Sequence, residues 1–170
     1  MDPNHSHFIF VKKLNDEYAS HEFRSELMKK LFQSDELCIT IVLNGDKSVL
    51  KTVLSSVESG IPVLLIRESR GAADLLANLI DKFKDLSFEE KNLLASKHDK
   101  DLEEKFYKQF EKEIQKGSYD LDNIKRLIQL YYNSIEENNV ILINAFELAD
   151  DIDLEIAVLK TLSDGNGIRI

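Results

Sequence analysis

Two polar loops of the sequence have the residue types and positions that could hold a phosphate. Asn44–Ser48 (NGDKS) directly follows the apolar run Cys38–Leu43 (CITIVL), and Arg67–Gly71 (RESRG) directly follows Pro62–Ile66 (PVLLI). Each loop precedes a helix-patterned segment, and the amino terminus of a helix attracts anions through its free N–H groups and its dipole. Open parallel sheets usually bind ligands at the carboxyl ends of their strands. The two loops are therefore the candidate ligand site.

Other groups that could do chemistry lack the partners that such chemistry needs. His5 and His7 lie two residues apart with no cysteine or further histidine nearby, which falls short of the three or four ligands of a zinc site. Ser69 and His98 are a hydroxyl and an imidazole, but nothing in the sequence places them together, and a Gly-x-Ser-x-Gly motif is absent. We therefore expect neither a metal site nor a nucleophilic enzyme.

Two clusters of charge have ordinary structural explanations. Asp150, Asp151, Asp153 and Glu155 lack the central glycine of a calcium loop, and acids at a helix start cap it and favour its dipole. Charges of both signs alternate through 82–116, which is typical of a solvated helix face. A contact surface for a neighbouring subunit would have the same polar outer face, so both interpretations of this run stay open.

The elements that must position the two loops alternate between strand and helix. Continuous Val-, Ile- and Leu-rich runs are typical of strands covered on both faces, and the helices between them are the crossovers that parallel strands require. The pattern predicts an α/β fold with an open parallel sheet of about four strands and flanking helices. The expected strands are His7–Val11, Cys38–Leu43, Pro62–Ile66 and Val140–Phe146.

Apolar residues at helical spacing predict the helices. The first crossover carries Val49, Leu50, Val53, Leu54 and Val57, and the second carries Ala72, Leu75, Leu76, Leu79, Ile80 and Phe83. A helix over Ser20–Gln33 is expected from Phe23, Leu27, Met28, Leu31 and Phe32. A helical insertion over 84–136 is expected to contain Phe88–Lys97, Asp99–Lys116 and Leu121–Glu136, and Asp150–Ser163 is expected to close the chain as a helix carrying Ile152, Ile156 and Leu159.

Composition excludes several classes of protein. A net charge of −9 argues against nonspecific attraction to nucleic acid or to an anionic bilayer, because such surfaces need an excess of Lys and Arg. Cys38 is the only cysteine, so an internal disulfide cannot form, and a reducing cytoplasmic compartment fits. The sequence has no apolar run long enough for a membrane span and no basic-then-apolar leader. At 170 residues, one domain is expected.

Three stretches together resemble a known family. They are DPNHSHFIFV, VLNGDKSVLKTVLSSVESGIPVLLIRESRGAADLLANL and ILINAFELADDIDLEIAVLKTL. They are similar to the amino-terminal cytosolic homology region of melastatin-type TRP (TRPM) cation channels, which itself resembles the Rossmann-like nucleotide-sensing domains of the SLOG superfamily (LSDAT). The resemblance spans nearly the whole chain. It implies that residues 1–170 form a single, partial SLOG domain that corresponds to the second half of the family domain and lacks the earlier strands and the pore.

Both loops depart from the glycine-rich pattern that the resemblance implies. In the first loop only Gly45 keeps a glycine. In the second, the family run Gly-Ser-Gly-Arg is replaced by Glu68-Ser69-Arg70-Gly71, which retains only Ser69 in place. In the first loop the remaining positions are Asp46, Lys47, Ser48 and Val49, whose side chains hinder close approach of a pyrophosphate and often forbid the required positive φ angles. In the second loop Glu68 adds a negative charge. Gly45, Ser48, Ser69, Arg70 and Gly71 are accordingly predicted to form a degenerate nucleotide site that binds ADP-ribose and related dinucleotides weakly or not at all.

Basic side chains near the loops offer partial compensation for the lost glycines. Lys47, Lys51, Arg67 and Arg70 carry positive charge that would draw an anion. Asp74, in the first turns of the second crossover helix, is predicted instead to stabilise the fold by accepting hydrogen bonds from backbone N–H groups.

Two functions from different classes follow from the resemblance. The preferred one is a non-enzymatic cytosolic regulatory and assembly module of a calcium-permeable TRPM-like cation channel, with other regions or subunits of such a channel as partners and with homo-oligomers as a further expectation. The alternative is a stand-alone SLOG-type protein that binds or cleaves nucleotides through a glycine-rich loop and a catalytic glutamate. The helix after the first loop offers only Glu58, at its far end.

Overall fold

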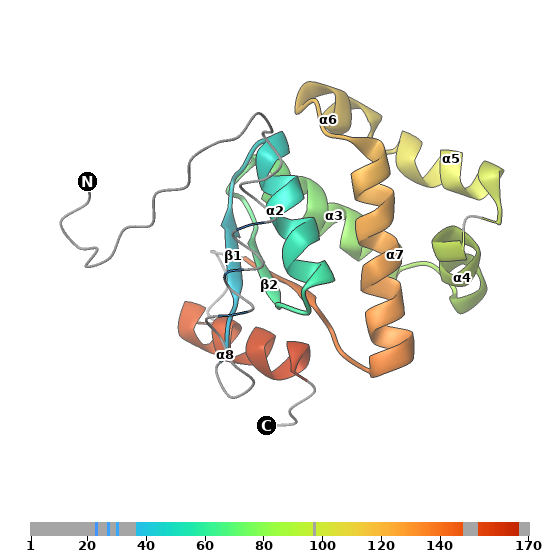
Figure 1. Cartoon of the computed structure of the whole chain (residues 1–170). Helices are drawn as coiled ribbons and strands as arrows, with labels where there is room; N and C mark the ends of the chain where they lie inside the picture. Colours follow the sequence, from blue (N-terminus) through green and yellow to red (C-terminus); the bar gives the residue numbers. More distant parts are fainter. Residues whose placement is uncertain are drawn as a thin grey trace.

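The computed structural model describes residues 37–96, 98–147 and 153–166, together with positions 23, 27 and 30. Within these ranges three strands form one parallel sheet in the order β1-β2-β3 (Figure 1). The strands are β1 (Thr40–Leu43), β2 (Val63–Ile66) and β3 (Ile143–Phe146). Three of the four predicted strands are thus confirmed, each shorter than expected at its amino end. The fourth, His7–Val11, lies outside the described residues, as does most of the predicted helix Ser20–Gln33.

The parallel register aligns the carboxyl ends of the strands. Thr40 pairs with Val63 and Leu43 with Ile66, while Val63 pairs with Ile143 and Ile66 with Phe146. Because Leu43 and Ile66 end neighbouring parallel strands, the loops that follow them leave the sheet at the same edge. The crossovers begin with α2 (Lys47–Glu58) after β1 and α3 (Gly71–Lys84) after β2.

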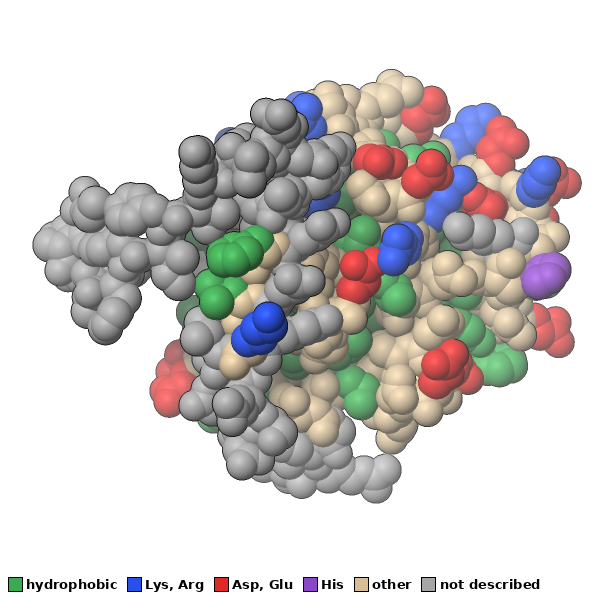
Figure 2. Space-filling model, viewed as in Figure 1, with side chains coloured by type: hydrophobic (Ala, Val, Ile, Leu, Met, Phe, Trp, Pro, Cys, Tyr) green, Lys and Arg blue, Asp and Glu red, His purple; other side chains and the backbone are tan. Residues whose placement is uncertain are grey.

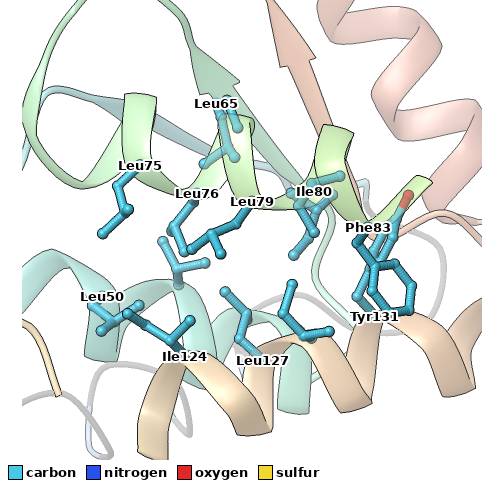
Figure 3. Packing of buried hydrophobic residues seen from close by; sticks show 14 of the residues in the cluster. Leu50, Leu65, Leu75, Leu76, Leu79, Ile80, Phe83, Ile124, Leu127 and Tyr131 are labelled. Carbon is cyan, nitrogen blue, oxygen red and sulfur yellow. The ribbon is translucent and has the colours of Figure 1, made fainter. Parts of the chain in front are cut away.

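The main hydrophobic core lies between the sheet and α2, α3 and α7 (Leu121–Asn138) (Figure 3). Both predicted crossover stripes face this core, with Val49 half-buried and the other members buried. Helix α7 contributes Ile124, Leu127, Ile128 and Tyr131, and the ring of Tyr131 meets Phe83 edge to face at a centroid distance of 6.2 Å. Edge-to-face contact of this kind stabilises an aromatic pair beyond the area it buries.

The other face of the sheet is covered by α8 (Leu154–Gly165), which lies opposite α2 and α3 (Figure 1). Leu64, Ile66 and Phe146 form a smaller cluster there, against which Ala157 and Val158 pack. All four residues of β2 are buried, as predicted for a strand covered on both faces. Strand β1 differs, because Ile41 and Leu43 are 49% and 66% exposed. The principal sheet contacts of α8 are with β2 and β3.

The helical insertion contains one more helix than the sequence pattern predicts. It comprises α4 (Phe88–Ser96), α5 (Lys100–Lys108), α6 (Glu111–Lys116) and α7. The single helix predicted over Asp99–Lys116 is wrong, because the chain breaks at Phe110, whose N–H donates to the Tyr107 carbonyl three residues back. This tighter turn, with φ −108° at Phe110, ends α5 while keeping Phe106, Phe110 and Ile114 buried.

The outer faces of the insertion carry both acidic and basic side chains. Figure 2 shows them interspersed over the side of the molecule where α4 to α7 lie. Among the described helices, none combines the length and the apolar character needed to cross a membrane.

Candidate functional site

The two candidate loops touch each other at the carboxyl edge of the sheet. The Asn44 N–H, at the end of β1, donates to Ser69 Oγ at 2.7 Å. The Ser69 hydroxyl in turn donates to the Ile66 carbonyl at 2.5 Å, at the end of β2. Ser69 therefore ties the first loop to the second, and the predicted proximity of the two loops is confirmed.

Backbone carbonyls of the first loop occupy the amino terminus of α3. The Ala72 N–H donates to the Gly45 carbonyl at 2.8 Å, and the Ala73 N–H donates to the Asn44 carbonyl at 3.0 Å. These N–H groups belong to the first turn of α3, where a helix has donors without partners inside the helix and where anions commonly bind. In this protein the donors at Ala72 and Ala73 are satisfied internally.

Gly71 permits this close approach of the two loops. It has φ 63°, and a Cβ at this position would lie 2.3 Å from the Gly45 carbonyl oxygen and 2.4 Å from Asn44 Oδ1. Both distances are far below van der Waals contact, so any larger residue would push the loops apart. The absence of a side chain at Gly71 thus allows the two loops to pack directly against each other.

A carboxylate caps the amino terminus of α2. Asp46 Oδ1 accepts from the Ser48 N–H at 2.8 Å and from the Ser48 hydroxyl at 2.6 Å. The Ser48 hydroxyl and backbone hydrogen bonds lower the pKa of the Asp46 carboxyl below its usual value, so the carboxylate is negatively charged at neutral pH. Its charge lies at the amino terminus of α2, a position that in other helices attracts anions.

Two non-glycine residues of the second loop hold backbone conformations that favour glycine. Glu68 has φ 60°, and Arg70 has φ 72° with ψ −175°. These are the two positions at which the family resemblance places glycine. The second loop thus keeps positive φ angles with Glu and Arg in place. Such conformations cost about 1–3 kcal/mol each for residues other than glycine.

Asp74 stabilises the second loop. Its Oδ2 accepts the Arg70 N–H at 2.8 Å, which confirms the predicted hydrogen bond to the backbone at the start of α3. The other oxygen, Oδ1, is buried without a hydrogen-bond partner. The carboxylate thus holds the strained Arg70 backbone from within the first turns of the helix.

Arg67 is engaged in an ion pair. Its guanidinium pairs with the Asp81 carboxylate, and it also donates to Asn78 Oδ1 at 3.4 Å. Both partners lie on α3, and the Arg67 side chain is 22% exposed. Arg67 is one of the four basic residues expected to attract an anion. Its positive charge is already balanced by the Asp81 carboxylate.

Tyr119, which the sequence did not single out, joins the helical insertion to the two loops. Its hydroxyl donates to the Gly45 carbonyl at 3.1 Å across a separation of 74 residues. Partial burial, with a smaller contribution from the Asp46 charge, raises the pKa of Tyr119, so the phenol stays protonated at neutral pH. Gly117 leaves room for the ring, because a Cβ there would lie 1.9 Å from it. A tyrosine two residues after a glycine is too common a pattern to have indicated this contact.

A cleft of about 440 Å³ lies between α3 and the α6–α7 turn, beside the loops. Its walls carry two basic residues, Arg70 and Lys116, and two acidic ones, Asp74 and Glu113. Polyphosphate sites carry an excess of positive charge, and this cleft has none.

A larger depression of about 710 Å³ lies across α5, α6 and α7, away from the loops. Lys125 is one of the residues that line it, and its ammonium group forms an ion pair with Glu103 and lies 5.7 Å from the centre of the Tyr107 ring. Burial raises the pKa of Tyr107 well above its usual value. Within the described residues, no group of three or more His, Cys, Asp or Glu side chains is placed to hold a metal ion.

The structure brings all five predicted site residues to one edge of the sheet. Gly45, Ser48, Ser69, Arg70 and Gly71 lie in the two loops or in the first turns of the helices that follow them. The contacts of Gly45, Ser48, Ser69 and Gly71 are made with other residues of the protein, in the two loops and in the elements beside them, while the Arg70 side chain is exposed. Ligand binding at these residues stays a prediction.

Comparison with known proteins identifies one family. A family model described as SLOG in TRPM matches residues 1–127, which include both loops, α2, α3 and the first turns of α7. A search of curated proteins gives no match. The match covers 127 of 170 residues and leaves β3 and α8 outside it.

Proposed function

The chain belongs to the SLOG family found in TRPM proteins, and on this premise we propose that it is a non-enzymatic regulatory and assembly module of a TRPM-like cation channel, with a nucleotide site that is closed. Its partners are other cytosolic regions or subunits of such a channel. The module acts through protein contacts at its surface, and ligand chemistry at the strand ends plays no part.

The observation that carries this proposal is the occupation of the α3 amino terminus by the first loop. The N–H groups of Ala72 and Ala73 already donate to the carbonyls of Gly45 and Asn44, at 2.8 and 3.0 Å. A phosphate would have to compete with both carbonyls for these donors, and the Gly45 carbonyl is held in place by a further hydrogen bond from the Tyr119 hydroxyl. The Asp46 carboxylate adds electrostatic repulsion at the neighbouring helix terminus.

The position of Glu58 supports a non-enzymatic role. This residue is the only acid of α2, and it lies in the last turn of the helix, where its carboxylate pairs with Arg126 at 2.5 Å. The first turn of α2, beside the candidate site, contains no acidic residue. A glutamate acting as a general acid or base must reach the reacting bond, and Glu58 lies at the opposite end of its helix from the loops.

Isothermal titration calorimetry with ADP-ribose tests the closed site. We expect no binding heat for the full chain. Micromolar affinity that is lost in Lys47→Ala or Arg70→Ala, and kept in the exposed control Lys112→Ala, would show a working site and would favour the alternative of a nucleotide-binding SLOG protein. Chromatography of the reaction mixture measures cleavage of the same nucleotide. Release of a base or a phosphate would contradict the non-enzymatic assignment.

The assembly role needs a separate measurement. The purified chain is immobilised, and the purified cytosolic region of a TRPM channel is passed over it in biolayer interferometry. Concentration-dependent binding is expected, with little change on addition of ADP-ribose. Absence of binding up to the highest attainable concentration would reject the assembly role, whatever the calorimetry shows.

A further inference from the structure

Helix α8 has apolar side chains on two opposite sides. On its inner side Ala157 and Val158 pack against the sheet. On its outer side Ile156 and Leu159 are 57% and 53% exposed. Ile156 and Leu159 belong to the stripe identified in the sequence, whose third member, Ile152, lies outside the described residues. A helix at the surface of a fold normally carries one apolar stripe, which faces the core, so the outer pair is a second apolar surface.

The outer side of α8 has the pattern of a short coiled-coil seam. Ile156 and Leu159 are three residues apart, as the a and d positions of a heptad are. Glu155 then stands at position g and Lys160 at position e, one on each flank of the seam, and both side chains are exposed. In parallel two-stranded coiled coils, a g residue faces the e residue five positions later in the partner.

We propose that α8 pairs in parallel with α8 of a second copy of this chain, through Ile156 and Leu159. An isoleucine at a with a leucine at d favours a parallel two-stranded arrangement. The twofold axis runs along the helices, so each Glu155 faces the partner subunit's Lys160. Two symmetry-related ion pairs therefore flank the apolar contact, one on each side. Figure 1 shows α8 at the outside of the fold, with the sheet between it and α2.

The surface at β1 is a separate one. Ile41 and Leu43 are also exposed, but they lie on a strand of four residues. The self-complementary charges Glu155 and Lys160 occur on α8. The seam has a single a position and a single d position among the described residues, so the dimer should be weak and its ion pairs sensitive to salt.

Sedimentation velocity over a concentration series of the full chain tests the contact. We expect a monomer–dimer equilibrium. Ile156→Glu and, independently, Leu159→Glu should each raise the dissociation constant at least about tenfold, because each substitution removes an apolar contact twice in the symmetric dimer. Phe88→Glu is the matched control, since Phe88 is 62% exposed on α4 and should leave the equilibrium unchanged. Circular dichroism confirms that each variant is folded.

A charge exchange tests the parallel orientation. Lys160→Glu alone should weaken the dimer, since it places two carboxylates opposite each other in each ion pair. The double variant Glu155→Lys/Lys160→Glu should restore the wild-type dissociation constant, because the same pairs re-form with the signs reversed. In an antiparallel pair, position e faces e and g faces g, so Lys160→Glu alone would only exchange a Lys–Lys pair for a Glu–Glu pair and would leave the dissociation constant nearly unchanged.

Three results would overturn the proposal. The first is a wild-type chain that is monomeric at several hundred micromolar, which would assign the outer side of α8 to a different polypeptide. The second is a dimer that resists both α8 substitutions and is lost in Leu43→Lys, which would place the contact at the edge of the sheet. The third is failure of the double charge variant to recover the dimer.

Discussion

Arg70 holds an unfavourable backbone conformation at the start of α3. Its φ of 72° with ψ −175° lies in a region that is essentially restricted to glycine, and its side chain is exposed. Arg70→Gly should therefore raise the free energy of unfolding by about 1 kcal/mol, the relief of strain exceeding the extra entropy of a glycine in the unfolded chain. Urea titration measures the change. Arg70→Ala is the control, because alanine keeps the Cβ and should bring no such gain.

Asp74 makes the hydrogen bond that holds the Arg70 backbone. Asp74→Ala should lower stability by about 0.5–2 kcal/mol, because it removes the acceptor of the Arg70 N–H. Asp74→Asn should lose less, since an amide oxygen still accepts this bond. Melting temperatures are compared at one concentration and pH. Equal values for the three proteins would mean that the hydrogen bond contributes nothing measurable.

The contact between the loops that begin α2 and α3 depends on a glycine at one position. Gly71→Ala should destabilise the protein strongly, by about 2 kcal/mol or more, because its Cβ would overlap the Gly45 carbonyl and the loops would separate. Gly60→Ala is a matched control, since Gly60 has a similar φ of 71° but nothing within 4 Å of an added Cβ. The difference between their urea midpoints isolates the steric term, and equal midpoints would contradict the tight contact.

The cap of α2 makes part of the stability depend on pH. Hydrogen bonds from Ser48 lower the pKa of Asp46 in the folded protein below 3.8, its ordinary value. A depressed folded pKa means that the cap stabilises the protein fully above the unfolded pKa and is lost as the pH falls through the folded value. Asp46→Asn should therefore differ from the wild type at pH 7, and this difference should shrink below about pH 4. Urea titrations of both proteins at pH 7 and pH 3 check this, and a difference independent of pH would contradict it.

At the scale of the whole molecule, the helical insertion and the sheet share one core. Leu127 of α7 is fully buried in the same cluster as Leu76 of α3 and Leu65 of β2. Leu127→Ala should cost about 2–5 kcal/mol and should lower the transition seen by every probe, because one cooperative unit unfolds at once. Leu93→Ala is the control within the insertion, since Leu93 is 39% exposed and its truncation should cost far less. Separate transitions for the sheet and the insertion would show that 84–136 folds independently.

The order of elements and their buried stripes were predictable from sequence because periodicity is local. Residues at i, i+3 and i+4 share a helix face in any fold, so the inward stripes of α2, α3 and α7 follow from spacing alone. The break at Phe110 was not predictable, because 100–116 keeps helical spacing throughout and the turn is set by how Phe106, Phe110 and Ile114 reach the core.

The sequence by itself determined the αβ alternation, the position of the two loops at one sheet edge and the loss of glycines from them. Tertiary structure decided whether those loops are open. The Gly45 carbonyl accepts the Ala72 N–H at the amino terminus of α3. The same carbonyl accepts the Tyr119 hydroxyl, 74 residues away in the sequence. Such pairings depend on how separate elements pack, which no local pattern encodes. The orientation of α8 was decided in the same way, since both of its sides are apolar and the sheet is covered by the side that carries Ala157 and Val158.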